Sequence, residues 1–383
     1  MLGFLLARAG IDVVVLEKHG DFLRDFRGDT IHPATLQVID QLGMLDEFRT
    51  LLQNEITTLD LVVQGRRFTP VDFSRLAPPA NFLGMVPQWD FLNFLVAKAA
   101  QYPQFTLLMN TTATDLLHQG NRVSGVMADG PEGPVQISAD LVVAADGRGS
   151  TLRTAAGLPV REVGIPIDVL WFRIGKLSPE PPPTLAYIGS TGMVLTIDRG
   201  DYYQAGMYVS KGSFEQIQAG GIEQFRARIL DIAPELAGVI EVIQTWDQVK
   251  LLTVQVNNLP RWHRPGLLCI GDAAHAMSPA FGVGINYAVQ DAIATANILT
   301  APLREHRVRS DDLAAVQRRR DRPTRMMQRA QVLLHQRISR PDPGRVLPAL
   351  IGVAAPIVEP ALQPLAARLV GLGLRPEYID HRT

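Results

Sequence analysis

The sequence predicts an α/β protein in which a discontinuous, Rossmann-like nucleotide-binding domain carries an inserted mixed or antiparallel β-sheet. Residues 141–145 and 267–270 are continuous apolar runs, and residues 11–16 are aliphatic except for Asp12; this pattern is typical of strands buried on both faces of a parallel sheet. Residues 166–255 differ, because their short apolar segments contain aromatic residues and are separated by turns. The two patterns alternate along the chain, so we expect one domain to be inserted into the other.

Glycine and proline residues indicate where the elements begin and end. Gly10 suits the end of a helix, Pro33 suits the start of the next one, and Gly43 interrupts it. In order, we expect a helix at 1–9, a strand at 11–16, helices from 33 and at 88–101, strands within 105–145, and a long helix at 284–299. The expected domains are a nucleotide-binding domain at 1–60, 88–165 and 256–335, a substrate domain at 61–87 and 166–255, and a C-terminal helical region at 336–383.

Composition excludes several classes of function. The formal net charge of -1 provides no overall field that would attract nucleic acid or an anionic membrane surface. Cys269 is the single cysteine, so no disulfide can form within the chain, and a cytoplasmic protein is expected. The uncharged run at 346–358 is 13 residues long and contains two prolines, which is too short for stable insertion across a membrane.

Glu17 follows the first buried strand directly. In a dinucleotide-binding fold, an acid at this position accepts hydrogen bonds from the hydroxyls of the adenosine ribose. The alternative is a solvated acid at a strand end, and it stays open because the glycine-rich loop that should precede the strand is absent.

A second candidate site has the pattern DGxxSxxR, from Asp146 to Arg153. Asp146 ends an apolar strand, at the position where open α/β sheets bind ligands. Ser150 is placed to cap the helix that follows. The alternative interpretation is an Asx turn that only caps this helix.

The strongest pattern is LLCIGDAAHAMSPAFGVGINYAVQD at 267–291. Gly271 permits a turn that a side chain would block, and the carboxylate of Asp272 can accept hydrogen bonds from a polyol such as ribityl. Gly282 and Gly284 would let a flat ring approach the backbone at the start of a helix, whose N–H groups stabilise negative charge on a reduced flavin.

In their order along the chain, these motifs resemble the flavoprotein monooxygenases related to para-hydroxybenzoate hydroxylase, which include ubiquinone-biosynthesis hydroxylases. The resemblance covers nearly the whole chain. It implies that Arg27, in FRGDTIHPATLQVIDQLG, contacts the flavin pyrophosphate or ribityl group, and that Gln88, in VPQWDFLNFL, reaches FAD. The residues expected to bind FAD are Glu17, Arg27, Gln88, Asp146, Gly147, Gly271, Asp272, Pro279, Gly282, Gly284 and Asn286.

The resemblance also implies a reaction. NAD(P)H would deliver hydride to FAD, and O₂ would add to the reduced flavin to give a C4a-hydroperoxide, which hydroxylates a hydrophobic phenolic or other aromatic substrate. No catalytic base and no metal site are assigned. Two alternatives stay open: an FAD-dependent reductase of prenyl or polyene double bonds, and a non-catalytic remnant. A flavin-dependent halogenase is disfavoured because its WxWxIP motif is absent.

Two features depart from the family pattern. The family opens with a strand and a GxGxxG loop, whereas Met1 falls inside the helix that should follow them. We therefore expect that about 15 residues, a strand plus its loop, are missing ahead of Met1. Phe281 stands where the family commonly has glycine, and we expect it to narrow the substrate pocket or to shift the loop.

Other conspicuous residues are interpreted as structural. His275 belongs to the framework at the start of the long helix. Trp171, Phe172 and Arg173 are expected in the core and scaffold of the inserted sheet. The arginines between 318 and 325 are expected to form the solvated face of a helix.

Overall fold

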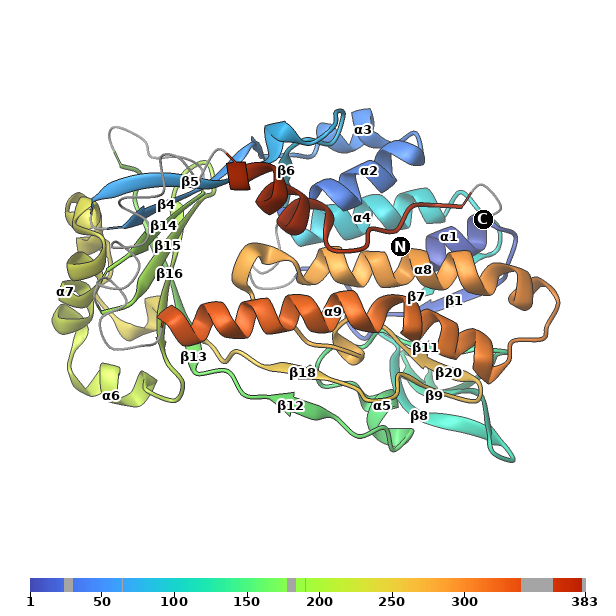
Figure 1. The fold of residues 1–383 in the computed structure, drawn as a ribbon. Coiled ribbons are helices and arrows are strands. Elements are labelled where there is room, and N and C mark those ends of the chain that lie inside the picture. Colours follow the sequence, from blue (N-terminus) through green and yellow to red (C-terminus); the bar gives the residue numbers. More distant parts are fainter. Residues whose placement is uncertain (24–29, 64, 178–183, 190, 339–360, 381–383) are drawn as a thin grey trace.

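The computed structural model describes residues 1–23, 30–63, 65–177, 184–189, 191–338 and 361–380. Two parts lie side by side: a large sheet backed by helices, and a helix-rich part with shorter sheets (Figure 1). The long helices α8 (Gly284–Arg304) and α9 (Ser310–Ile338) run beside each other through the second part, and α9 extends to the large sheet.

The aliphatic runs form parallel strands, as predicted, in two separate sheets. β1 (Val13–Leu16) pairs with β7 (Phe105–Leu108), and β11 (Val142–Ala144) pairs with β20 (Leu267–Cys269), which β19 (His263–Arg264) extends in antiparallel fashion. The expectation that the first strand is buried on both faces is wrong. Within the described residues β7 is the one partner of β1, and Val14 is 45% exposed.

Helices cover these strands. α1 (Leu2–Arg8), α4 (Gln88–Ala99) and α8 pack around buried apolar side chains such as Phe4 and Ile293. Gly10 follows α1 with a φ of +79°, and Pro33 is the first residue of α2 (Pro33–Gln41), in agreement with the sequence patterns. This part also contains α3 (Leu45–Arg49), α5 (Thr151–Ala155), an antiparallel sheet of β8 (Thr112–Gln119), β9 (Arg122–Gly130) and β10 (Gly133–Ser138), and a small sheet of β2 (Thr30–Ile31), β6 (Leu83–Met85) and β3 (Asn54–Ile56).

The large sheet is mixed, because β14 (Thr184–Ile188) pairs in parallel with β4 (Thr58–Val63) while the other neighbours are antiparallel. Its described strands, in spatial order, are β17 (Lys250–Leu252), β13 (Ile167–Ile174), β16 (Tyr203–Ser210), β15 (Met193–Asp198), β14 (Thr184–Ile188), β4 (Thr58–Val63) and β5 (Arg66–Asp72). Of residues 61–87, β5 therefore belongs to this sheet, whereas β6 pairs with β2 and β3.

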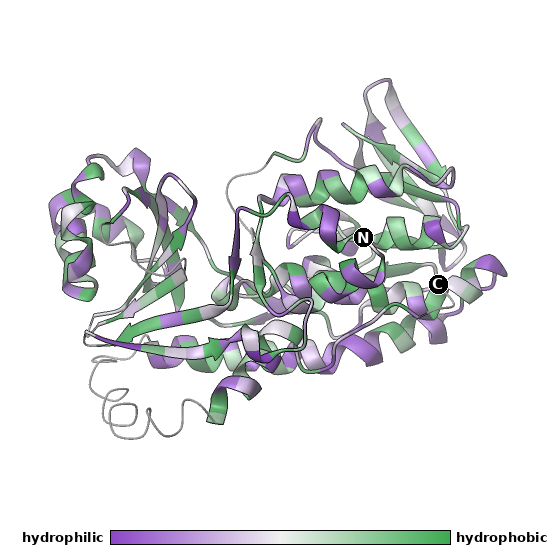
Figure 2. Cartoon of the chain, turned by 90° about the horizontal axis from the view of Figure 1, so that it is seen from above, coloured by the Kyte–Doolittle hydropathy of each residue, from purple (hydrophilic) through white to green (hydrophobic). Residues whose placement is uncertain are grey.

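The two faces of the large sheet have different environments. Along β16, Tyr203 and Met207 are buried against α6 (Phe214–Ala219) and α7 (Ile222–Ile232), whereas Gln204 and Tyr208 line a cavity on the opposite face. Figure 2 shows the strands as largely hydrophobic, while the helices outside them alternate hydrophobic and hydrophilic residues.

Further segments connect the two parts. β12 (Arg161–Val163) and β18 (Val256–Asn258) form an antiparallel pair between them. After α9, a helix at 361–367 and a π-helical turn at Arg368–Leu372 pack against apolar residues of β5 and β6. Among the helices of the described chain, none is long and apolar enough to cross a membrane.

The arginines of α9 do not form a single solvated face, contrary to expectation. Arg318 and Arg322 are exposed, but Arg320 is 1% exposed. The reason is that α8 and the C-terminal segment cover this side of the helix. There, the carboxylates of Asp291 and Glu377 pair with the guanidinium of Arg320.

Candidate active site

A cavity of about 1060 Å³ lies between the inner face of the large sheet and the loops that precede α5 and α8. Ligand sites in proteins commonly enclose about 300–1,000 Å³, so this cavity is large enough for more than one small molecule. One wall consists of strand residues such as Leu61 and Leu195. The other wall includes loop residues at 145, 147–148, 270–272 and 277–282.

Asp272 lies on the loop wall, in the turn Gly271–Ala273 directly after β20. Gly271 has a φ of +57°, which favours glycine, and a Cβ there would lie 3.1 Å from the Cβ of Ala288. Burial raises the pKa of Asp272, and the nearby Arg148 and His275 oppose that shift. The turn therefore presents a carboxylate to the cavity, where it can accept hydrogen bonds from hydroxyl groups.

The buried carboxylate of Asp291 stabilises the Gly271–Ala273 turn on the side away from the cavity. Asp291 on α8 accepts a hydrogen bond from the backbone N–H of Gly271 at 3.0 Å, and its Oδ2 lies 2.5 Å from Nε2 of His275. Burial alone would raise the pKa of Asp291, but His275, Arg320 and the Gly271 N–H together hold it below its ordinary value. His275 is 1% exposed and supports the turn, which agrees with its structural interpretation.

Asp146 caps a helix and does not line the cavity. Its carboxylate accepts hydrogen bonds from the hydroxyl of Ser150 and, at 3.2 Å, from the backbone N–H of Leu152 in α5. The neighbouring Gly147 and Arg148 do line the cavity. For the side chain of Asp146, the structure therefore favours the capping alternative, while the loop that it shapes reaches the site.

Arg153 ties this loop to the Asp272 turn. Its guanidinium donates hydrogen bonds to the backbone carbonyls of Arg148, at 2.7 Å, and Ala273, at 3.0 Å. Its backbone N–H donates to the hydroxyl oxygen of Ser150 at 3.0 Å. The DGxxSxxR spacing thus builds a helix cap and a bridge between two loops.

The loop before α8 brings backbone close to the cavity. Gly282 has a φ of +63°, and a Cβ there would lie 2.3 Å from Oγ1 of Thr30, so a side chain cannot fit without movement. Gly284 is the first residue of α8 and lines the cavity, and a Cβ there would meet no atom within 4 Å. Pro279 and Phe281 line the same wall, and Phe281 has a φ of +65°. Phe281 therefore occupies part of this wall.

The other predicted cofactor residues lie in different places. Gln88 begins α4 and lines the cavity. Glu17 follows β1, where its carboxylate accepts a hydrogen bond from the backbone N–H of His19 at 2.9 Å, and it is not part of the cavity wall. Arg27 lies outside the described residues.

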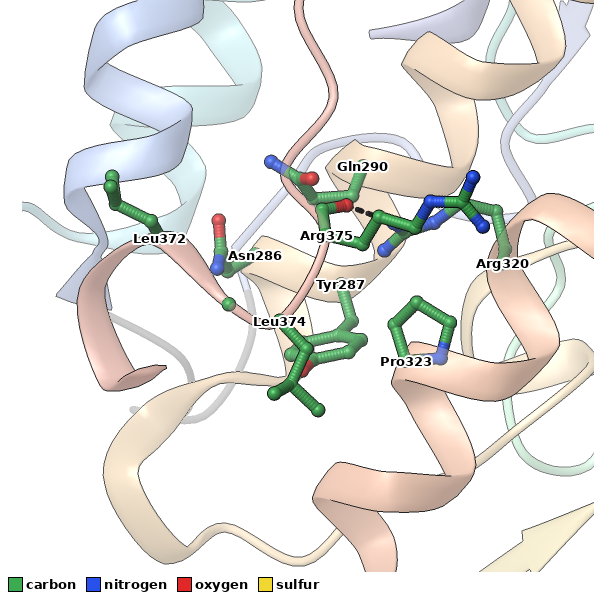
Figure 3. A pocket seen from close by; sticks show the side chains of 9 residues that line it. Asn286, Tyr287, Gln290, Arg320, Pro323, Leu372, Leu374 and Arg375 are labelled. Atoms are coloured by element: carbon green, nitrogen blue, oxygen red, sulfur yellow. Dashed lines mark hydrogen bonds between the residues drawn. The ribbon is translucent and has the colours of Figure 1, made fainter. Parts of the chain in front are cut away.

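Asn286 faces away from the cavity, contrary to expectation. Its Oδ1 accepts a hydrogen bond from the hydroxyl of Thr35 at 3.0 Å, and it lines a separate, narrow pocket with Tyr287 and Gln290 (Figure 3). The reason is helical periodicity. After Gly284, the residues of α8 that line the cavity lie on one face of the helix: Ile285, Ala288, Val289 and Ala292. Asn286 lies on a different face, which points toward α2.

Sequence reasoning missed the residues that the sheet and α9 contribute. Trp171, expected in the core, lines the cavity, whereas Phe172 is buried on the other face of the sheet. Tyr208 stacks on His335 of α9 with ring centroids 5.8 Å apart, and Nε2 of His335 lies 2.6 Å from the hydroxyl oxygen of Ser278. Burial raises the pKa of Tyr208 and lowers that of His335 to about 4. Strand alternation could have identified Trp171, but no local pattern pointed to His335.

The loop wall fits FAD by the chemistry of its residues. The carboxylate of Asp272 offers acceptors for ribityl hydroxyls, and the amide of Gln88 offers both donors and acceptors. The open space beside Gly284 lies at the N-terminus of a long helix, where a flat, electron-rich ring is stabilised.

Comparison with known proteins identifies the family. The FAD binding domain family matches residues 1–330. A 6-methylpretetramide 4-monooxygenase from Streptomyces rimosus is 32% identical over 374 residues, which cover 96% of this chain and 88% of that protein. Two further curated relatives, at 25% and 24% identity, are longer, and the chain spans 61% and 57% of their lengths.

Solved structures share the fold. The OxyS anhydrotetracycline hydroxylase from Streptomyces rimosus aligns with a TM-score of 0.75 at 21% identity, over 97% of this chain and 72% of that chain. The p-nitrophenol 4-monooxygenase PnpA from Pseudomonas putida DLL-E4 aligns with a TM-score of 0.75 at 19% identity, over 96% and 91%. The chain therefore belongs to the FAD binding domain family, and it is an FAD-dependent oxidoreductase of the monooxygenase class.

Proposed function

We propose that this enzyme hydroxylates a fused-ring, phenolic aromatic substrate with O₂, using FAD that NAD(P)H reduces. The observation that supports the proposal most directly is the composition of one cavity. The loops that precede α5 and α8, which we propose bind FAD, form one of its walls, and the apolar inner face of the large sheet forms the other. FAD on the loop wall and an aromatic ring on the strand wall would meet inside it.

The strand wall supports a hydrophobic, flat substrate. Leu61, Ile188 and Leu195 give it an aliphatic surface, and Trp171 and Tyr208 add aromatic rings on which another ring can stack. The cavity of about 1060 Å³ exceeds what a single-ring phenol needs. The relatives named for 6-methylpretetramide and anhydrotetracycline support a polyketide as the substrate class.

The proposed reaction puts one atom of O₂ into the product and the other into water. NAD(P)H supplies a hydride, solvent supplies a proton, and a C–H bond of the ring becomes C–OH. Bound FAD would supply the redox chemistry, and the route through reduced flavin and O₂ that the family resemblance implies is part of this proposal. The chain would orient the ring, exclude water with the strand wall and direct the α8 N-terminus at the cofactor.

The proposed cofactor site includes residues from several loops. Its members on the cavity wall are Gln88, Gly147, Gly271, Asp272, Pro279, Gly282 and Gly284. Glu17 and Arg27 are proposed for the adenosine and pyrophosphate end of FAD. The division of the chain into an FAD-binding domain and an inserted substrate domain belongs to the same proposal.

Oxygen consumption separates this function from its alternatives. The FAD-reconstituted protein is given NADPH or NADH with a panel of fused-ring phenols that includes anhydrotetracycline. We expect substrate-dependent O₂ uptake and a product that gains one oxygen atom. A reductase would oxidise NAD(P)H while sparing O₂, and a remnant would bind no flavin. Either result would overturn the proposal.

A further inference from the structure

Phe281 has a backbone conformation that is unfavourable for a bulky side chain. It lies in the turn Ala280–Gly282 before α8, with a φ of +65° and a ψ of 1°. In this left-handed region the Cβ of an L-residue is crowded by the backbone, so glycine normally occupies it. Bulky residues are rare there, and they occur mostly at functional sites. Because glycine would form the same turn without strain, the turn alone does not account for the phenylalanine.

The backbone on both sides of this residue is fixed by hydrogen bonds. On one side, the buried Gln331 of α9 donates from Nε2 to the carbonyls of Ser278 and Ala280, at 3.1 and 3.0 Å. Its Oε1 accepts from the N–H of Ser278 at 3.2 Å. On the other side, the hydroxyl of Thr30 donates to the carbonyl of Gly282 at 3.3 Å. A strained residue persists where its surroundings fix it in this way.

The loop presents the phenyl ring at the cavity. Phe281 lines the cavity and is 39% exposed, whereas Ala280 and Val283 of the same loop are 5% and 0% exposed. Among the described loop residues of the cavity wall, Phe281 provides the one aromatic ring. On the strand wall, Trp171 and Tyr208 provide two more. Both walls can therefore make stacking or edge contacts with a flat aromatic molecule.

We infer that Phe281 is a specificity-determining residue that packs against the aromatic rings of the substrate. The phenyl ring would contact the substrate from the loop wall, while the strand wall contacts it from the other side. The site would then select planar fused rings over saturated molecules with the same carbon skeleton. This inference rests on the proposed function, because it names the shape of the substrate that the same site selects. The affinity for FAD should not depend on the phenyl ring, which offers no polar atom to the ribityl and phosphate groups.

Equilibrium binding tests the inference without turnover. The FAD-reconstituted protein, without NAD(P)H, is titrated calorimetrically with 2-naphthol and with decahydro-2-naphthol, which share a carbon skeleton and a hydroxyl position, although only the first is planar. We expect the wild type to bind 2-naphthol roughly tenfold more tightly. Phe281→Gly should reduce the affinity for 2-naphthol by roughly ten- to thirtyfold and the preference for the planar molecule by roughly three- to tenfold. Its affinity for FAD should be unchanged.

Further variants separate the phenyl ring from the backbone. Phe281→Ala should lose the same preference, because it also lacks the ring, but it retains the strained conformation. Phe281→Gly should therefore unfold at a temperature about 1–3 °C higher than Phe281→Ala. At an ordinary position alanine is the more stable of the two. Phe281→Tyr keeps an aromatic ring and should keep the preference.

His306→Gly is the matched control for the binding measurements. His306 also has a left-handed backbone, with a φ of +50°, but it is exposed and does not line the cavity. This variant likewise removes a ring from a left-handed residue, and it should leave the preference for 2-naphthol unchanged.

Four results would overturn the inference. Three concern Phe281→Gly: a preference for 2-naphthol that survives, an equal loss of affinity for both alcohols, or a loss of FAD affinity as large as that for 2-naphthol. The fourth is a higher unfolding temperature for Phe281→Ala than for Phe281→Gly, because the phenylalanine would then carry no conformational cost. The outcome is separable from hydroxylation. Planar selectivity that depends on Phe281 without hydroxylation would uphold the inference and contradict the proposed function, and hydroxylation without this selectivity would do the reverse.

Discussion

Arg320 on α9 donates a hydrogen bond from Nε to Oδ1 of Asp291 on α8 at 3.0 Å, and both side chains are almost completely buried. The other oxygen of Asp291 accepts a hydrogen bond from the backbone N–H of Gly271. The guanidinium also donates to the backbone carbonyl of Arg375 at 3.1 Å (Figure 3). One ion pair thus connects the Asp272 turn, α9 and the C-terminal segment.

Arg320→Leu should lower the free energy of unfolding by about 3–5 kcal/mol, because it removes the guanidinium that pairs with the buried carboxylate of Asp291. Arg318→Leu is the control, since Arg318 lies on the same helix but is exposed. It should change stability by no more than about 0.5 kcal/mol. Guanidinium denaturation measures the free energy of unfolding of both variants. Equal decreases in the two variants would show that the buried ion pair does not contribute more to stability than an exposed arginine.

His32 should make stability depend on pH. Burial lowers the pKa of His32 from 6.5 to about 4, so between these values the unfolded chain binds more protons than the folded one. Its contribution to the free energy of unfolding is therefore complete above about pH 6.5 and falls by about 3 kcal/mol as the pH drops toward 4.

His32→Asn should flatten this slope, as measured by chemical denaturation at several pH values across that range. His118→Asn, at an exposed position, is the control and should leave the slope unchanged. If both variants keep the slope of the wild type, His32 does not cause it.

Gly284→Ala should weaken FAD binding without loss of stability. A Cβ at this position meets no atom within 4 Å, but it enters the space proposed for the flavin ring. Gly282→Ala should instead lower stability, because its left-handed conformation costs about 1–2 kcal/mol for other residues and its Cβ would lie 2.3 Å from Oγ1 of Thr30. Flavin titration and thermal unfolding distinguish the two effects. Unchanged FAD affinity in Gly284→Ala would remove the start of α8 from the cofactor site.

Asp272→Ala should reduce FAD affinity ten- to a hundredfold while the fold is retained, because a charge-assisted hydrogen bond to a hydroxyl is lost. FAD affinity of the wild type should fall as the pH decreases through the raised pKa of Asp272, since the protonated carboxyl is a poorer acceptor. Asp146→Ala is the matched comparison. Asp146→Ala should lower the free energy of unfolding by about 1 kcal/mol, because the carboxylate of Asp146 caps α5. A loss of FAD affinity in Asp146→Ala together with a loss of stability alone in Asp272→Ala would contradict both assignments.

Local patterns predicted the parallel strands and the turn at Asp272, because a buried strand followed by glycine constrains the chain within a few residues. The direction of Asn286 could not be predicted in the same way, since it depends on which side of α8 packs against α2. Trp171 was misplaced for a related reason: on a strand, a shift of one residue moves a side chain to the other face. The burial of Arg320 depends on Glu377, which is distant in sequence.

Isotope labelling tests the central claim most directly. The FAD-reconstituted protein is incubated with NAD(P)H and a fused-ring phenol that it turns over, under heavy-isotope O₂, and the product is analysed by mass spectrometry. We predict that each product molecule contains one heavy oxygen atom, bonded to a ring carbon. A product with no oxygen from O₂, whether reduced or hydrated, would contradict the assignment as an aromatic monooxygenase.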